Sequence, residues 1–235
     1  MAAKTNTYAP LKDSVILFLS NIVVEALSVW LIAPLIVYVM VNGCLQGFGI
    51  DVAIDWYMNK AKYWGYVTII SSIIIILFRY LTVGYYIRKY KAYIKLDLEH
   101  AKRIIPIIVI VVILEIIIYP LLINESYTPQ ALAEYNYYVE LGVGFYGYLL
   151  ELVYYVLEGL MLAIILYMGS HINQWSGLAI LLILWTPIHI LHGSGIDIIN
   201  FVWAVTTALV LEFTRRRVDN NLLSILLVWM MIVLV

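Results

Sequence analysis

The chain has 235 residues, of which 64% are hydrophobic and only 12% are charged, and its formal net charge is −1. A soluble domain carries roughly a quarter charged residues, so this composition excludes an ordinary soluble protein, and the near-neutral charge provides no basic surface for nucleic acid. The single cysteine, Cys44, excludes an intrachain disulfide, a cysteine-rich zinc site and a Cys-x-x-Cys redox pair.

Apolar blocks about 20 residues long predict membrane-spanning helices. We expect about seven spans, at about 14–42, 63–87, 104–123, 139–168, 176–192, 196–214 and 221–235. The segment 44–62 mixes apolar and acidic residues, which is typical of a short helix along a membrane interface. Residues 1–235 contain no internal repeat and no soluble domain, so the predicted fold class is all-α, a polytopic transmembrane helical bundle in one integral membrane domain.

The distribution of lysine and arginine in the loops predicts the orientation. Segment 88–103 contains six such residues and 215–217 three, whereas 124–138 contains none. An odd number of spans with a cytoplasmic N-terminus places these basic loops in the cytoplasm, as expected for a multi-pass protein of the cell membrane. The N-terminus lacks a short apolar region followed by a small-residue cleavage site, so we expect no removable signal peptide.

Five ionisable residues are predicted to lie in one layer inside the membrane. Their distances from the cytoplasmic ends of their spans are similar for Glu25, Arg79, Glu115, Glu158 and His189. A charge at this depth costs about 2.5–3.5 kcal/mol, so such groups should face each other or a cavity. On consecutive antiparallel spans, Arg79 and Glu115 are expected to form an ion pair, and the sequence leaves open whether Glu25 joins it or stays protonated.

A second group of residues carries the chemistry of a candidate active site. Glu151 and Glu158 are seven residues apart and therefore share a helix face, and His189 and His192, three apart, are expected to share one too. A carboxylate that takes a proton from water, opposite an imidazole that orients the water or stabilises an oxyanion, is an arrangement suited to hydrolysis. These side chains could also hold a divalent metal, but the spacing His-Glu-x-x-His is absent, so we assign no metal ligands, and the sequence leaves the cofactor unknown.

A structural interpretation of the histidines is equally open at this point. Pro187, Gly193 and Gly195 would break the helix, and His189 and His192 would then satisfy the freed backbone carbonyls.

Residues 150–230 resemble the CPBP family of intramembrane proteases, which includes the CAAX prenyl endopeptidases and bacteriocin-processing proteins. The stretch VLEGLMLA at 156–163 resembles the family motif Glu-Glu-x-x-x-Arg, and WTPIH at 185–189 resembles Phe-x-x-x-His. The resemblance implies that Glu158 activates the attacking water and that His189 belongs to the oxyanion-binding side. Leu157 and Leu162 stand where the family has its first glutamate and its arginine, and the final run 222–235 lacks the motif His-x-x-x-Asn.

The sequence therefore predicts a membrane-embedded endopeptidase of the CPBP type, with degenerate motifs and with Glu158, His189 and His192 as candidate catalytic residues. Its partners would be the lipid bilayer and a peptide or membrane-protein substrate. The alternative is a non-catalytic integral subunit or scaffold, in which the polar layer only joins helices and the lateral faces bind a larger membrane complex. A small transporter is a third class, but the inverted repeats typical of transporters are absent from the sequence.

Overall fold

The computed structural model of the chain describes the backbone of residues 8–40, 60–95, 97–118, 120–121, 127–192, 195–196 and 198–235. Apart from one short antiparallel pairing, the described chain is helical. The elements are α1 (Tyr8–Leu27), η1 (Ser28–Ile32), α2 (Ala33–Val39), α4 (Lys60–Tyr90), α5 (Leu98–Ile113), η4 (Leu114–Ile118), α7 (Gln130–Glu140), α8 (Gly144–Ser170), α9 (Ser176–Ile180), η5 (Leu181–Trp185), η6 (Thr186–Ile190), β1 (Leu191–His192), β2 (Gly195–Ile196), α10 (Ile198–Arg217) and α11 (Leu222–Leu234).

Four helical runs are long and apolar enough to cross a membrane, so the predicted all-α membrane architecture is confirmed at this level. They are Tyr8–Val39, Tyr63–Tyr90, Gly144–Ser170 and Ile198–Arg217, and two shorter apolar helices cover Ser176–His189 and Leu222–Leu234. Residues 44–59 of the predicted interfacial segment 44–62 lie outside the described residues.

The predicted fourth span, 139–168, differs from the structure at its start. Helix α7 ends at Glu140 and α8 begins at Gly144, so the chain turns where an unbroken helix was expected. Gly142 and Gly144 have φ values of 76° and 47°, which a glycine adopts without steric penalty. Because of this turn, α7 packs back against α8 instead of extending it.

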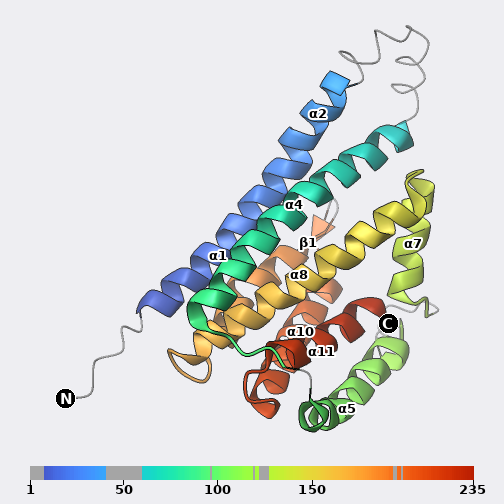
Figure 1. Cartoon of the computed structure of the whole chain (residues 1–235). Coiled ribbons are helices and arrows are strands. Elements are labelled where there is room, and N and C mark those ends of the chain that lie inside the picture. Colours follow the sequence, from blue (N-terminus) through green and yellow to red (C-terminus); the bar gives the residue numbers. More distant parts are fainter. Residues whose placement is uncertain are drawn as a thin grey trace, which may run out of the picture.

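Helix α8 is the centre of the bundle. It contacts α1, α4, α7, α9, α10 and α11, and the long helices α1–α2, α4 and α8 run side by side while α5, α10 and α11 lie to one side (Figure 1). Residues 161–166 of α8 are each at most 1% exposed. A helix that is apolar around most of its circumference belongs in the interior, and this one carries the core.

Three π-helical turns share a cause, since each precedes a proline. A proline ring clashes with the carbonyl of the residue four positions earlier and cannot donate the hydrogen bond that this carbonyl expects. For Pro34, Pro120 and Pro187 that carbonyl belongs to the middle residue of η1, η4 and η5 respectively. The backbone relieves the clash by widening the turn. The kink expected at Pro34 therefore takes the form of a wide turn.

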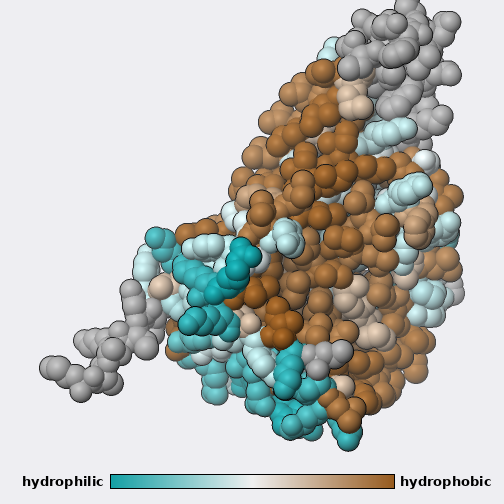
Figure 2. Space-filling view, in the orientation of Figure 1, coloured by the Kyte–Doolittle hydropathy of each residue, from teal (hydrophilic) through white to brown (hydrophobic). Residues whose placement is uncertain are grey.

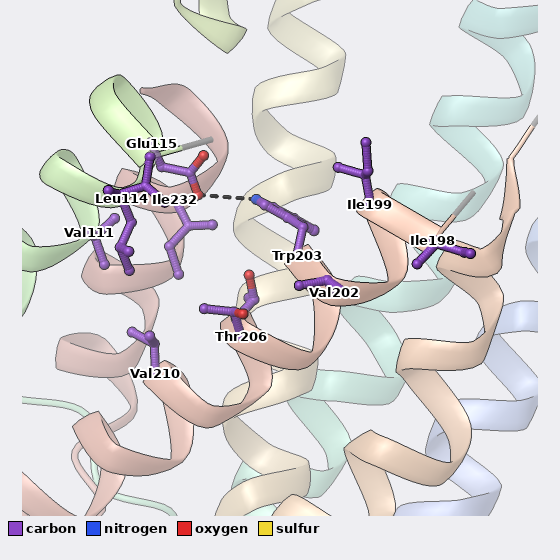
Figure 3. A pocket seen from close by; sticks show the side chains of 12 residues that line it. Val111, Leu114, Glu115, Ile198, Ile199, Val202, Trp203, Thr206, Val210 and Ile232 are labelled. Atoms are coloured by element: carbon purple, nitrogen blue, oxygen red, sulfur yellow. Dashed lines mark hydrogen bonds between the residues drawn. The ribbon is translucent and has the colours of Figure 1, made fainter. Parts of the chain in front are cut away.

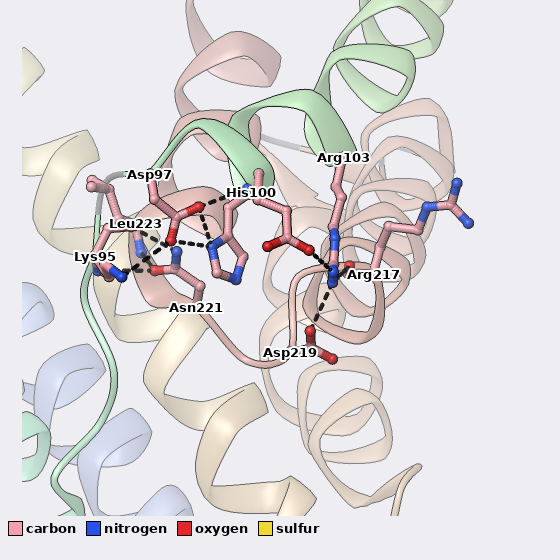
Figure 4. Close-up of polar contacts among 9 residues, drawn as sticks. Lys95, Asp97, His100, Arg103, Arg217, Asp219, Asn221 and Leu223 are labelled. Carbon is pink, nitrogen blue, oxygen red and sulfur yellow. Dashed lines mark hydrogen bonds and ion pairs between the residues drawn. The ribbon is translucent and has the colours of Figure 1, made fainter.

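Polar side chains gather at one end of the molecule. The surface is largely apolar along the helices, and hydrophilic residues concentrate where α4 ends and α5 begins (Figure 2). There Lys89 donates to Asp13 at 2.5 Å, joining α4 to α1. Arg103 of α5 contacts Asp219 at 2.7 Å, and Asn221, the N-cap of α11, donates to the carbonyl of Lys95 at 2.7 Å (Figure 4). The basic segments of the sequence thus meet at a single end.

The C-terminal part of α10 adds a buried arginine to this end. Arg215 is 6% exposed and binds Glu212 through two hydrogen bonds of 2.7 and 2.8 Å. It also donates to Asn220 at 2.6 Å and to the carbonyl of Gln174 at 3.2 Å. Bidentate arginine–carboxylate pairs combine strength with directional specificity. This residue therefore fixes the α8–α9 and α10–α11 loops to each other.

Asp97 makes the stability of this end depend on pH. It precedes α5 and accepts hydrogen bonds from the backbone N of His100 at 2.9 Å and from its Nδ1 at 2.7 Å, which lower the pKa of the carboxyl group. A carboxyl whose pKa is lower in the folded state stabilises that state above its unfolded pKa, about 4, and this contribution disappears as the pH falls through the folded-state value. We expect the difference in thermal midpoint between wild type and Asp97→Ala to be largest at pH 6 and to become smaller as the pH falls toward 3.

Thermal unfolding in detergent across this pH range measures the effect. Asp97→Asn is the matched control, because asparagine also caps a helix but does not titrate. A gap between wild type and Asp97→Ala that stays constant from pH 6 to pH 3 would contradict the expectation.

Candidate functional site

Arg79 lies at the centre of a polar cluster between α1, α4 and α8. Its side chain is 1% exposed, and Nη2 donates to Oε2 of Glu25 at 2.9 Å. The hydroxyl of Tyr154 on α8 donates to Oε1 of the same carboxylate at 3.1 Å, and the guanidinium lies 4.3 Å from the centre of the Tyr154 ring. The ion pair and the cation–π contact join three helices in the interior of the bundle.

The predicted ion pair between Arg79 and Glu115 is wrong. Arg79 binds Glu25, whereas Oε1 of Glu115 accepts a hydrogen bond from Nε1 of Trp203 on α10 at 3.0 Å. Helix α4 packs against α1, while α5 packs against α10 and α11, so the two residues belong to different helix pairs. The sequence left open whether Glu25 contacts Arg79. In the structure Glu25 forms the ion pair with Arg79 that was predicted for Glu115.

Glu115 and Trp203 line an apolar cavity of about 270 Å³ between η4 and α10 (Figure 3). The remaining lining comes mainly from isoleucine, valine and leucine side chains, with two threonines on α10. Neither Glu158 nor His189 belongs to this lining.

Glu158 contacts the side chain of Trp185. Nε1 of the indole donates to Oε1 of the carboxylate at 3.3 Å, which links α8 to η5. Glu158 is half-buried, and the contact with Trp185 uses one of its two carboxylate oxygens. Arg79 lies within electrostatic range of the same carboxylate.

His189 packs against the same tryptophan. Its ring centre lies 4.4 Å from that of Trp185 and 5.9 Å from that of Trp203. Nδ1 is 3.1 Å from the backbone carbonyl oxygen of Trp185. A carbonyl can only accept a hydrogen bond, so Nδ1 carries the hydrogen in this contact.

The structure supports the helix break that was one interpretation of the histidines. Helix η6 ends at Ile190, and Leu191–His192 pairs with Gly195–Ile196 in an antiparallel register. The expectation that His189 and His192 share a helix face is wrong for this reason. The backbone of His192 lies in β1, and its side chain lies outside the described part.

Glu151 has its own partner, away from Trp185. Its Oε2 accepts a hydrogen bond of 2.6 Å from the hydroxyl of Tyr138 on α7, and Tyr155 makes a similar bond of 2.9 Å to Glu134. The two glutamates that share a face of α8 therefore serve different contacts, Glu151 joining α7 to α8 and Glu158 joining α8 to η5.

Three residues of the site were missed by reasoning from the sequence. Tyr154 lies one turn before Glu158, so the spacing of four residues could have identified it. Trp185 was considered only as a motif position, and Trp203 gave no signal because an indole in an apolar helix is ordinarily part of the core. Trp185 lies 5.9 Å from Trp229 between ring centres, and Trp229 donates to the carbonyl of Tyr155 at 2.8 Å. The tryptophans thereby hold the carboxylate and the imidazole in place.

Across the described ranges, no group of three or more His, Cys, Asp or Glu side chains is arranged to hold a metal ion. No protein-family model, curated protein or solved structure matches the chain.

Proposed function

We propose that the chain crosses the cell membrane seven times, with its N-terminus in the cytoplasm. The support comes from the polar end of the molecule, where hydrogen bonds join Asp13 to Lys89 and Arg103 to Asp219. These residues belong to the segments whose lysines and arginines the positive-inside rule assigns to the cytoplasm. The shorter helices α9–η6 and α11 would cross with little tilt or beside a thinned membrane.

Within this bundle, we propose a membrane-embedded hydrolase that resembles the CPBP intramembrane proteases and cleaves a peptide bond. The observation that carries this proposal is the shared contact with Trp185: Glu158 accepts a hydrogen bond from its indole N–H, and the ring of His189 packs against its ring at an angle of 58°, from two different helices. A carboxylate and an imidazole held against one rigid indole have a fixed relation to each other, which general acid–base catalysis requires.

Each group has a defined role in this proposal. Water bound to the carboxylate of Glu158 transfers a proton to it as the water oxygen attacks the peptide carbonyl, and the carboxyl group then returns the proton to the leaving amine. The imidazole of His189, held beside Trp185, orients the water or stabilises the developing oxyanion.

Incorporation of ¹⁸O tests the proposal even though the substrate is unidentified. The protein in lipid nanodiscs is incubated in H₂¹⁸O with a pool of synthetic peptides that includes prenylated C-terminal tetrapeptides and apolar membrane-spanning sequences. Hydrolysis places ¹⁸O in each new carboxyl terminus, which mass spectrometry detects. We expect Glu158→Gln and His189→Ala to reduce labelled termini by about 100-fold or more, the usual contribution of a general acid–base group.

Glu151→Gln is the matched control, since it makes the same chemical change on the same helix at a residue bonded to Tyr138. It should retain the labelling of the wild type to within about threefold if its fold is intact, because the groups that act on the water at Glu158 are unchanged. Equal labelling by wild type and Glu158→Gln, or none by the wild type, would refute the hydrolase proposal.

One observation favours a second candidate, a non-catalytic membrane subunit. Carboxylates of the bundle bind side chains on neighbouring helices, as Glu25 does with Arg79, Glu115 with Trp203 and Glu151 with Tyr138. Such bonds join helices where no hydrophobic effect drives them together. This candidate predicts a stoichiometric partner on purification and an assembly that Glu158→Gln leaves unchanged.

A further inference from the structure

The face of α1 and η1 that meets α4 is polar in an otherwise apolar segment. Its polar residues recur at spacings of one, three, four and seven, which keeps them on one side of the helix. They are Asp13, Ser14, Asn21, Glu25 and Ser28, and all but Glu25 are at most 8% exposed. We call the inner part of this face, from Asn21 to Ser28 together with Arg79, the α1–α4 seam.

The seam has a regular antiparallel register with α4. Nδ2 of Asn21 donates to Oγ1 of Thr82 at 3.3 Å, and one helical turn further along α1 Glu25 binds Arg79, which lies three residues before Thr82. Helix η1, which begins at Ser28, also packs against α4. These polar groups therefore form one continuous strip between two packed helices.

Four polar atoms of this strip are buried without a hydrogen-bond partner among the described residues. They are Oδ1 of Asn21, Oγ of Ser28, and Nε and Nη1 of Arg79. Leaving such an atom unpaired costs about 1–3 kcal/mol, and more for a charged group. Two acceptors and two donors on one strip are a combination that lipid hydrocarbon cannot satisfy and that small polar molecules can.

The seam is accessible from the surface at Glu25. The side chain of Glu25 keeps 32% of its surface accessible although its partner Arg79 is 1% exposed. A buried water molecule typically makes two to four hydrogen bonds to groups of this kind. Larger anions fit less well, because Glu25 and Glu158 both lie within electrostatic range of Arg79 and two carboxylates outnumber one guanidinium.

We propose that the α1–α4 seam binds a cluster of ordered water molecules, bonded to Asn21, Ser28 and the free donors of Arg79. The cluster lies beside Glu25 and on the side of α8 that carries Tyr154 and Glu158. Water there links the two carboxylates and gives the buried charge of Arg79 a polar environment. The inference goes beyond the proposed hydrolase, since the water cluster would be present whether or not Glu158 is catalytic.

Radiolytic footprinting tests the cluster directly. A millisecond X-ray pulse produces hydroxyl radicals from water at its binding site, so a buried cysteine is oxidised only if water lies next to it. With Cys44 replaced by serine, Ser28→Cys places a thiol in the seam, and Ala33→Cys places one at an equally buried position, since both residues are 0% exposed. We expect the thiol at position 28 to be oxidised at least ten times faster than the thiol at position 33 in nanodiscs.

A second pair of variants covers the case in which Ser28→Cys does not fold. Asn21→Cys lies on the seam and Val83→Cys points into the apolar core, and both residues are 1% exposed. The same excess in rate is expected for position 21. Equal oxidation within the folded pair would overturn the proposal, and this result is independent of any loss of hydrolysis in Glu158→Gln.

Discussion

Glu25→Leu is expected to lower the free energy of unfolding by about 3–5 kcal/mol, the usual cost of removing one partner from a buried ion pair. The variant leaves the guanidinium of Arg79, which is 1% exposed, without its carboxylate. Arginine does not lose its proton at any accessible pH, so the charge cannot be neutralised. Unfolding in bicelles, followed by steric trapping, measures the change.

The reverse substitution, Arg79→Met, should cost less. The carboxyl group of Glu25 can take up a proton, keeps its hydrogen bond from Tyr154 and is partly accessible. The double variant Glu25→Leu/Arg79→Met should have a free energy of unfolding close to that of the wild type, because replacing a buried ion pair by apolar side chains is often neutral for stability. A double variant as unstable as Glu25→Leu alone would show that the ion pair itself is needed.

Lys89→Met is the control at the exposed end of the same helix pair. Lys89 also binds a carboxylate on α1, Asp13, but its side chain is 40% exposed. Such pairs contribute at most about 1 kcal/mol. If Lys89→Met lowered the free energy of unfolding as much as Glu25→Leu, the burial of Arg79 would not explain the large effect of Glu25→Leu.

Gly169→Ala is expected to destabilise the protein by about 3 kcal/mol, at the upper end for overpacked cores. A methyl group at this position would overlap the backbone N and Cα of Gly177, where α8 and α9 cross. Backbone atoms cannot rotate away as the end of a side chain can, so the helices would have to separate. The thermal midpoint and the yield of folded protein in detergent report the effect.

Gly84→Ala provides the matched comparison on α4. A methyl group there meets nothing nearer than Nη1 of Arg88 at 3.8 Å, which is ordinary van der Waals contact. Alanine is a better helix former than glycine, by about 0.5–1 kcal/mol, so this variant should be as stable as wild type or slightly more so. Similar losses for Gly84→Ala and Gly169→Ala would exclude the close crossing as the cause.

The long apolar helices could be predicted from the sequence, whereas the partners of the polar residues could not. Counting residues along a helix gives the level of a side chain in the membrane, and it placed Glu25, Arg79 and Glu115 together. It does not give the direction in which the helix faces, which depends on packing. Glu25 and Glu115 were both predicted at the level of Arg79. Arg79 binds Glu25, its neighbour in space, whereas Glu115, which is nearer to it in the sequence, binds Trp203.

The catalytic role of Glu158 and His189 stays a prediction. The two residues were selected by their chemistry, and the structure shows that both contact Trp185. The role of Trp185 as a common support depends on how α8 and η5 cross, which no local pattern contains. The helix end before His192 was open to prediction from Pro187, Gly193 and Gly195, and one of the two interpretations gave it correctly.

The wide turns before Pro34, Pro120 and Pro187 change how substitution scans of this protein must be interpreted. Each π turn accommodates one residue more than an α-helical turn does, and one residue corresponds to a rotation of about 100° around the axis. A conventional helical wheel drawn through η1 into α2 therefore assigns the positions of α2 to the wrong side. Scanning data should show their periodicity jump by one position at residues 28–32, with unchanged periodicity in α1 and α2.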